Sequence, residues 1–322
     1  MPRPEVHIAE MVSKVARTRA MVIILCLMAG GAFYKSKWNL ASGYWSRPLQ
    51  MCNCDKCLAE RDKELKDILD VSPKPFLSKW DRTSEDEFNW WKHLQFEKRP
   101  FSVFNEIVDR LFTIFPSVPD VEGPSPYRCR KCAVVGNSGN LKGSGYGKLI
   151  NDHDIVIRMN HGRTKGYEED VGTKTTHHVM YPESAVYLDN STHLVLFSFK
   201  INDLLWLLRT FTPRENGQEN PEKRGNKNLV MMLNPAFMKY VHEVWLKGAG
   251  RYPSTGFMVF VLSLQMCDEV SVFGFGANQD GNWHHYFEKM KINQMRIHHG
   301  IQEYEMIQQL HQKQIIRFFK GL

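Results

Sequence analysis

The chain has 322 residues, of which 43% are hydrophobic and 24% are charged, with 42 Lys and Arg against 35 Asp and Glu. This ordinary globular composition excludes a collagen, an intrinsically disordered chain and a protein that crosses a membrane many times. The net charge of +7 is a mild excess, and no Lys/Arg run with interleaved aromatic residues is present. An anionic small ligand is therefore a better match than nucleic acid.

An uncharged apolar run, residues 20–34, lies near the N-terminus between basic residues. As a helix it is about 22 Å long, which suits the thinner membranes of the early secretory route. Basic residues on its N-terminal side predict a single-pass type II signal-anchor, with residues 1–19 in the cytosol and residues 35–57 forming a short stem inside a lumen. A cleaved signal peptide is the alternative, because Gly30-Gly31-Ala32 offers small residues at a plausible cleavage site.

Cysteine usage agrees with a lumenal location. Outside the apolar run the chain has an even number of cysteines: Cys52, Cys54, Cys57, Cys129, Cys132 and Cys267. An even set in an oxidising compartment favours disulfides, with a zinc site at Cys52-x-Cys54-x2-Cys57 as the alternative. The sequon Asn190-Ser191-Thr192 lies in a polar, loop-like stretch and predicts glycosylation of Asn190.

Helical patterns begin soon after the stem. Ser84 and Glu87 have capping-box spacing and predict the start of a helix. A second amphipathic helix is expected from Ser102, as its cap, to Pro116. Asn234 is the expected cap of a helix that ends at Lys247.

Apolar segments that are typical of strands alternate with these helices. They are Cys132–Gly136, Ile155–Met159, Leu194–Phe199, Leu229–Leu233, Val270–Phe275 and Ile315–Phe319. The longer apolar run Thr255–Met266 is too short to cross a bilayer and predicts a buried helix. The alternation predicts an α/β domain over residues 58–322, with a mostly parallel sheet and helices on both faces.

Two of the predicted strands run straight into Gly-rich turns. Residues 136–147 follow the first strand, and Gly274-Phe275-Gly276 follow the fifth. Ligands of such sheets bind at the carboxyl ends of the strands, where glycines let backbone amides approach a phosphate or a sugar. The first turn matches neither the P-loop nor the dinucleotide fingerprint, so glycines that serve tight turns only are the alternative.

Histidines gather near the C-terminus in two adjacent pairs, His284-His285 and His298-His299. Because the imidazole alone has an unperturbed pKa near neutrality, these residues are candidates for a base and an acid in catalysis. Surface or satisfied core histidines are the alternative, and a structural role is the interpretation that we favour for His177-His178.

An Asp-x-Asp sequence, Asp152-His153-Asp154, resembles the metal-binding motif of many nucleotide-sugar transferases. It directly precedes the strand predicted over Ile155–Met159, at the amino end rather than the ligand-binding end. We therefore do not assign a metal site, although a metal-dependent transferase that uses Asp152 and Asp154 stays an alternative.

Four segments, in order, resemble the sialyl motifs of animal sialyltransferases. CAVVGNSGNLKGSGYG, DIVIRMN and DVGTKTTHHVMYPES, within residues 132–184, resemble the large motif, and residues 234–276 resemble the small motif. His285-Tyr286-Phe287-Glu288 resembles the third motif, and His298 with Glu303 resembles the very small one. Within that family the chain is most similar to the β-galactoside α-2,3-sialyltransferases of types 1 and 2.

The resemblance implies a Rossmann-like domain, a variant of the A-type glycosyltransferase fold, that binds the donor CMP-sialic acid with no metal and no other cofactor. It implies inverting transfer of sialic acid to the 3-hydroxyl of terminal galactose in Galβ1-3GalNAc on glycoproteins and glycolipids, by a Golgi membrane enzyme. A catalytically silent lumenal glycan-binding homologue and a sialyltransferase with a different galactoside acceptor are the alternatives. The oligomeric state stays open, with a homodimer as one alternative.

Roles for single residues follow from the resemblance by position. His298 would be the general base that takes the proton of the galactose hydroxyl, and His285 would be the second catalytic residue, which contacts the donor phosphate and assists its departure. Gln95 and Tyr252 would contact the acceptor. The residues implied to bind or line the donor site are Asn137, Asn160, Tyr181, Tyr252, Ser254, Thr255, Gly256 and Gly276.

The resemblance also implies a disulfide between Cys132 and Cys267. Four lumenal cysteines then remain, and Cys52 and Cys54 are too close in the chain to be good partners. We therefore expect Cys129 to pair with one of the stem cysteines.

Three features depart from the family pattern. Only 12 residues separate His285 from His298, which is shorter than expected for types 1 and 2. This segment covers the acceptor in the family. His299 follows His298 where an acidic residue is usual, which makes His299 the alternative base. Residues 210–228 contain no Tyr, although the family has a phosphate-contacting Tyr in this region.

Overall fold

The computed structural model describes residues 21, 52–55, 57–58, 62–119, 121, 125–213, 217–218, 220, 224–277, 280–281, 283–289 and 298–322. The predicted tail, the signal-anchor apart from Met21, and most of the predicted stem lie outside the described residues. No helix within the described residues is both long enough and apolar enough to cross a membrane.

Seven strands form one sheet in the order β5-β4-β3-β2-β1-β6-β7, and every neighbouring pair is parallel. The strands are β1 (Lys131–Val135), β2 (Ile155–Met159), β3 (His177–Met180), β4 (His193–Leu196), β5 (Val230–Met232), β6 (Glu269–Phe273) and β7 (Arg317–Phe319). The chain moves outward from β1 to β5 and then returns to place β6 on the other side of β1. This reversal is a topological switch point, where open α/β sheets bind their ligands.

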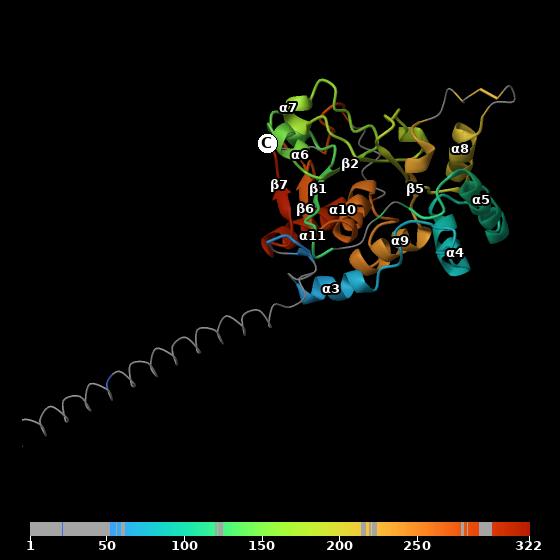
Figure 1. Ribbon diagram of the computed structural model, residues 1–322, viewed down its shortest axis with the longest axis horizontal. Helices are drawn as coiled ribbons and strands as arrows, with labels where there is room; N and C mark the ends of the chain where they lie inside the picture. The colour runs from blue at the N-terminus through green and yellow to red at the C-terminus, as the bar shows by residue number, and fades with distance from the viewer. Residues whose placement is uncertain are drawn as a thin grey trace, which may run out of the picture. The chain divides into compact units, whose positions relative to one another are not determined.

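Nine α-helices of the described residues accompany the sheet. They are α3 (Lys63–Asp70), α4 (Glu85–Leu94), α5 (Phe101–Ile114), α6 (Gly147–Asn151), α7 (Glu168–Val171), α8 (Ile201–Phe211), α9 (Pro235–Tyr240), α10 (Thr255–Met266) and α11 (Gly300–Gln312). Helices α4, α5 and α8 gather beside the β5 edge of the sheet, whereas α6 and α7 lie near β1 and β2 (Figure 1). The predicted mostly parallel α/β fold is confirmed.

The core has two faces, one on each side of β1. Cys132 and Val134 belong to the large hydrophobic cluster that includes α10, whereas Ala133 and Val135 belong to a second cluster with residues of α6 and α7. Successive residues of a strand point to opposite faces, so helices cover the sheet on both sides. Helix α10 packs against β1, β2 and β6, which explains why it is apolar all round.

Most predicted strand segments are present with shifted ends. β2 has the predicted bounds, and the other five segments differ by one to three residues at an end. The segment predicted over 270–275 ends at Phe273 because Gly274 adopts a left-handed conformation, with φ of +70°. The sequence analysis did not predict strand β3. All four of its residues are buried, but only Val179 and Met180 are apolar, because the strand begins with two histidines.

The predicted cap of α4 is confirmed, and the predicted cap of α5 is an error. Ser84 and Glu87 form the predicted capping box at the start of α4. The expectation that Ser102 caps α5 is wrong. Pro100 is the N-cap, and its carbonyl accepts from the amides of Val103 and Phe104, so Ser102 lies inside the helix.

The helix predicted from Asn234 to Lys247 has the predicted cap but changes in its second half. The Asn234 side chain accepts a hydrogen bond from the amide of Ala236 at 3.0 Å. The α-helix ends at Tyr240 and continues as a π-helix over Val241–Trp245. Such π-helical turns are rare and are often found near functional sites.

Three disulfides join the described cysteines. The structure has the Cys132–Cys267 bond that the resemblance implies, together with Cys54–Cys129 and Cys52–Cys57. Cys129 thus pairs into the stem cluster as expected, and the alternative of a zinc site at residues 52–57 is wrong because the sulfur atoms of Cys52, Cys54 and Cys57 are all in disulfides. The same cysteines are buried, so this end of the predicted stem is part of the folded unit.

A stacked pair of imidazoles links β3 to β4. The ring centroids of His177 and His193 lie 4.4 Å apart with an interplanar angle of 8°. Burial, with smaller contributions from His193 and Arg130, lowers the pKa of His177 to about 3. The unfolded His177 side chain has a pKa near 6.5. Between about pH 3 and pH 6.5, His177 therefore binds a proton in the unfolded state but not in the folded state.

We predict that this difference makes unfolding strongly pH-dependent. The stabilisation from His177 is complete above pH 6.5 and is lost as the pH falls toward 3, by about 1.4 kcal/mol per pH unit. Between pH 7 and pH 5 the free energy of unfolding should therefore fall about 2 kcal/mol further in the wild type than in His177→Gln. Urea denaturation at several pH values measures this, and His93→Gln, at an exposed site, should follow the wild type. Parallel curves for the wild type and His177→Gln would contradict the prediction.

Candidate active site

The turns that follow β1 and β6 contact each other at the switch point, where open α/β sheets form the crevice that binds a ligand. The amide of Gly136 donates to the carbonyl of Phe273 at 2.8 Å, and the amide of Ser138 donates to Gly274 at 3.0 Å. The Ser138 hydroxyl donates to the carbonyl of Gly276 at 2.7 Å. A Cβ atom on Gly136 would lie 2.3 Å from the Gly274 carbonyl oxygen, so this glycine permits the close approach of the two turns.

Asn137 lies buried in the turn after β1, with one polar atom unpaired. Its side-chain amide donates to the carbonyl of Met159, at the end of β2, at 3.1 Å. Its side-chain oxygen is buried and has no hydrogen-bond partner in the described part of the chain. Buried polar atoms without partners are rare, and this one is an acceptor that a bound ligand can satisfy.

Asn160 is held in a left-handed conformation, with φ of +55°, at the end of β2. Its carbonyl accepts from Nε2 of His178 at 2.6 Å, and its side-chain oxygen accepts from the Ser184 hydroxyl at 3.2 Å. Burial lowers the pKa of His178 to about 4, so this imidazole is neutral and donates through Nε2. These bonds orient Asn160 with its side-chain amide nitrogen left for a ligand. They give His178 the structural role that we favoured.

His298 lies beside Tyr252 just before α11. Its Nδ1 atom is 2.9 Å from the carbonyl oxygen of Tyr252, and the two rings meet edge to face with centroids 4.9 Å apart. A carbonyl only accepts, so Nδ1 carries the proton and Nε2 keeps its lone pair. His298 is half-buried, whereas His299 is exposed, which favours His298 as the base.

An aromatic row leads from His298 to Tyr181. Tyr252 contacts Phe199 with ring centroids 5.5 Å apart, and Phe199 contacts Tyr181 at 5.8 Å. Gln95 donates from Nε2 to the Tyr252 hydroxyl at 3.1 Å, and burial raises the pKa of this hydroxyl, which keeps its proton. The structure therefore brings together the residues that the resemblance implies at the acceptor side.

The N-terminus of α10 adjoins both groups. A Cβ atom on Gly256 would lie 3.1 Å from the Phe275 ring and 3.6 Å from the Met159 sulfur. Ser254 is the N-cap, and its hydroxyl accepts from the amide of Phe257 at 3.1 Å. The positive end of the helix dipole and the first-turn amides make this position suitable for an anion.

Glu303 fastens α11 to this cap. One carboxylate oxygen accepts from the Ser254 amide at 2.8 Å, and the other accepts from the Ser254 hydroxyl at 2.6 Å. The spacing of His298 and Glu303 in the sequence gave no indication of this partner. The carboxylate is buried, so the segment that carries His298 is held directly against the N-terminus of α10.

His285 is placed by the turn after β1. Its backbone forms an antiparallel bridge with Ser138, and the amide of Tyr286 donates to the carbonyl of Asn137 at 2.9 Å. The Glu288 carboxylate accepts from Nδ1 of His285 at 2.9 Å. This leaves Nε2 of His285 for a ligand.

The Asp-x-Asp sequence lies at the other end of the sheet. The carboxylate of Asp154 accepts from the amide of Lys131, the first residue of β1, at 2.8 Å. Asp154 therefore fixes the start of β1, at the end of the strand opposite the crevice.

The predicted glycosylation residue Asn190 and a nearby cavity lie apart from the crevice. Asn190 is exposed, and it borders a cavity of about 370 Å³ that also includes Thr210 and Phe211 at the C-terminal end of α8. Because β4 leads into the N-terminus of α8, this cavity is on the amino side of the sheet. It does not include any of the candidate active-site residues.

Comparison with known proteins identifies the family. The family model described as glycosyltransferase family 29 (sialyltransferase) matches residues 76–315. The chain belongs to this sialyltransferase family. The expectation from the four sequence motifs is thus confirmed, and the protein is an enzyme of this family.

Named relatives and a solved structure agree over most of the chain. CMP-N-acetylneuraminate-beta-galactosamide-alpha-2,3-sialyltransferase 1 of Gallus gallus is 40% identical over 289 residues, which cover 85% of this chain and 83% of that protein. The type 2 enzyme of Mus musculus is 39% identical over 284 residues, covering 84% and 80%. A mammalian sialyltransferase in complex with Gal-beta-1-3GalNAc-ortho-nitrophenol has a TM-score of 0.72 and 39% identity, covering 84% of this chain and 100% of that one.

We predict that Gly136→Ala is strongly destabilising. The new methyl group cannot fit 2.3 Å from the Gly274 carbonyl, so β1 and β6 must separate at their carboxyl ends. Overpacking of this kind costs about 1–3 kcal/mol of unfolding free energy, measurable by urea denaturation. Gly225→Ala is the matched control, because its Cβ atom would make only ordinary contact with Leu188 at 3.4 Å. Equal stability of the two variants would contradict the prediction.

Proposed function

We propose that the protein transfers sialic acid from CMP-sialic acid to the 3-hydroxyl of terminal galactose in Galβ1-3GalNAc glycans, with inversion at the anomeric carbon. The family, the named α-2,3-sialyltransferase relatives and the disaccharide complex of a similar structure support this acceptor and linkage. The observation that carries the proposal is His298, whose Nε2 lone pair is free for a proton beside the Gln95–Tyr252 pair.

In this proposal His298 is the general base. Nε2 takes the proton of the galactose 3-hydroxyl as its oxygen attacks the anomeric carbon of sialic acid and the bond to CMP breaks. The Nδ1 proton stays bonded to the Tyr252 carbonyl, which fixes the tautomer and stabilises the imidazolium as it forms. Gln95 and the Tyr252 hydroxyl orient the sugar.

The donor is proposed to lie across the switch point. The unpaired oxygen of Asn137 and the free amide of Asn160 would bind the nucleoside. The phosphate would lie between Nε2 of His285 and the N-terminus of α10, at Thr255 and Gly256, with Gly276 and Tyr181 lining the site. Helix amides and one imidazole stabilise the negative charge that develops on departing CMP. They also take the place of the phosphate-contacting Tyr that is absent from residues 210–228.

We further propose the Rossmann-like variant of the A-type fold and a type II Golgi location, with residues 20–34 as the anchor and Asn190 glycosylated. Three disulfides among the described residues support an oxidising compartment. The exposure of Asn190 makes its side chain accessible for modification.

We expect His298→Ala to abolish most activity. Loss of a general base lowers kcat by about 10²–10⁴-fold, with little change in the affinity for CMP. The assay uses the full chain in detergent, CMP-sialic acid and Galβ1-3GalNAc, followed by determination of the product linkage. His299→Ala should retain most of the wild-type activity.

The opposite pattern would assign the base to His299. A wild-type protein that binds CMP but forms no product would favour the silent glycan-binding homologue. Product with another galactoside only would change the acceptor and leave the base assignment intact.

We expect the reaction to proceed without a divalent metal. The rate in excess EDTA should equal the untreated rate, because helix amides and an imidazole are proposed to bind the phosphate. Asp152→Asn should remain active, since the Asp-x-Asp sequence lies at the amino end of β2. Loss of activity in EDTA that manganese restores would favour the metal-dependent alternative.

A further inference from the structure

The turn after α4 places an aromatic residue where glycine is usual. Gln95 is the C-cap, and the amide of Glu97 donates to the carbonyl of Lys92 at 2.8 Å, which is the long-range bond of a Schellman motif. Phe96 occupies the left-handed position of this motif, with φ of +56°. This conformation is strained for a bulky side chain because its Cβ atom crowds the backbone carbonyl.

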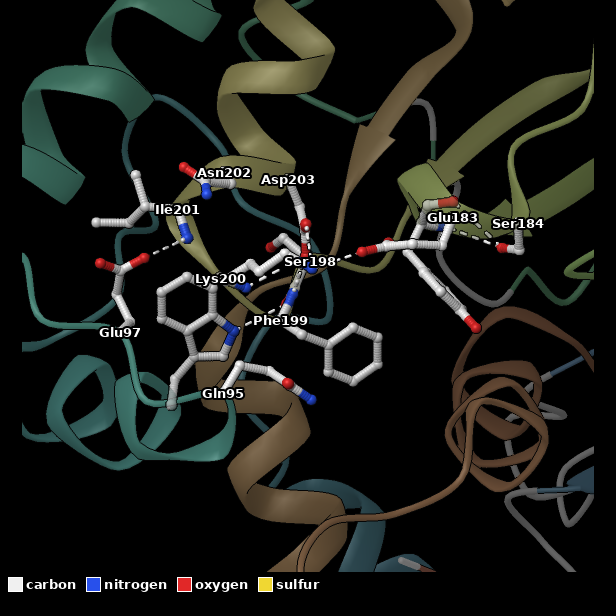
Figure 2. A network of polar contacts seen from close by, with 12 residues as sticks. Gln95, Glu97, Glu183, Ser184, Ser198, Phe199, Lys200, Ile201, Asn202 and Asp203 are labelled. Atoms are coloured by element: carbon white, nitrogen blue, oxygen red, sulfur yellow. Dashed lines mark hydrogen bonds and ion pairs between the residues drawn. The ribbon is translucent and has the colours of Figure 1, made fainter. Parts of the chain in front are cut away.

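Contacts from Arg99 and from the start of α8 hold the turn in this conformation. The Glu97 carboxylate accepts from Arg99, with Nε at 2.7 Å and Nη2 at 2.6 Å, and from the amide of Ile201 at 3.1 Å. Figure 2 shows Glu97 directed at the Ile201 amide, with Gln95 on the neighbouring part of the turn. Arg99 lowers the pKa of Glu97 to about 2, so this clamp is charged at any working pH.

Core packing does not explain the strain at Phe96. The side chain is 75% exposed, so it contributes little apolar burial. The guanidinium of Arg251 covers the ring at 4.6 Å from its centroid. Strain that persists at an exposed residue beside a site is typical of a functional requirement.

The Phe96–Arg251 pair lies next to the proposed acceptor contact. Gln95 and Tyr252 form one cross-link between two chain segments, and their neighbours Phe96 and Arg251 form the next. Tyr252 is buried, whereas both members of the second pair are exposed. The second pair is therefore the outer rim of the acceptor site.

We propose that Phe96 and Arg251 form a subsite for the sugar that carries the acceptor galactose, a 2-acetamido sugar. This inference rests on the proposed function. The aromatic ring offers a flat apolar surface for the face of a pyranose, and the guanidinium offers donors for its hydroxyl and acetamido oxygens. The galactose would contact the inner pair, so the next sugar outward meets the outer pair.

The test compares two acceptors that differ only in this sugar. The full chain is assayed with CMP-sialic acid and either methyl β-galactoside or the methyl glycoside of Galβ1-3GalNAc. The measured quantity is the ratio of kcat/KM for the disaccharide to kcat/KM for the monosaccharide. Loss of one aromatic contact should lower this ratio about tenfold in Phe96→Gly, whereas Phe96→Tyr should retain it.

Gln314→Gly is the matched control. Gln314 has φ of +57° at the equivalent position after α11, where the amide of Ile315 donates to the carbonyl of Leu310. Glycine relieves the same strain in both variants, so both should remain folded, as thermal melting will show. Only Phe96→Gly should change the acceptor ratio.

An unchanged ratio in folded Phe96→Gly would overturn the subsite, as would an equal change in Gln314→Gly. These outcomes require a wild-type protein that sialylates at least one acceptor, and they leave the proposed function intact. A wild-type protein that sialylates neither acceptor would contradict the proposed function and the subsite with it.

Discussion

The parallel pairing of β1 with β6 is the constraint on which the site depends. These strands are far apart in the chain, yet their carboxyl ends approach so closely that Gly136 has no room for a side chain. The Cys132–Cys267 disulfide closes a separation of 135 residues at the opposite end of the same pair. In the loop-entropy model such a closure contributes about 4–5 kcal/mol, by restricting the unfolded chain. The crevice that holds Asn137 exists only when this pairing is made.

A buried carboxylate joins the two halves of the proposed chemistry. Glu303 binds both the amide and the hydroxyl of Ser254, so α11 and α10 cannot move independently. His298 precedes α11, and the proposed phosphate position is at the start of α10. The same contact therefore sets the base relative to the leaving group. A buried carboxyl group needs its hydrogen-bond partners, so loss of either contact with Ser254 would destabilise the packing of α11 on α10.

Local patterns in the sequence predicted the elements whose signals are local. The bounds of Ile155–Met159 and Thr255–Met266 are as predicted, because their apolar runs end at polar residues or caps. Strand β3 was missed because His177 and His178 are buried by tertiary contacts that periodicity does not reveal. The cap of α5 was misplaced because serine at the N-terminus of a helix is a common signal, whereas Pro100 supplies only a carbonyl.

The site shows the same division. The resemblance named Asn137, Asn160 and His298, but the partners that orient them come from distant segments. The contact of Glu303 with Ser254 spans 49 residues, and that of Glu97 with Ile201 spans 104. No spacing rule in a single sequence connects such pairs, because they are set by the sheet order and the packing of helices on it. The family was therefore predictable from the sequence, and the contacts that orient these residues were not.

The glycine turns of the crevice and the rim pair Phe96–Arg251 differ in the amino-acid substitutions that they tolerate. Added Cβ atoms would lie 2.3 Å from backbone at Gly136, and 2.5 Å from side chains at both Gly274 and Gly276. A side chain at Gly136 would therefore push the ends of β1 and β6 apart, and side chains at Gly274 and Gly276 would displace Leu141 and Tyr304. Phe96 is an exposed side chain on the clamped turn, and Arg251 is an exposed side chain on the neighbouring segment, so a change of either leaves the contact of Glu97 with Ile201 in place. Changes in acceptor choice that leave the reaction itself unchanged should thus arise at Phe96 and Arg251. The backbone strain at Phe96 would then serve the choice of acceptor and not the catalytic step.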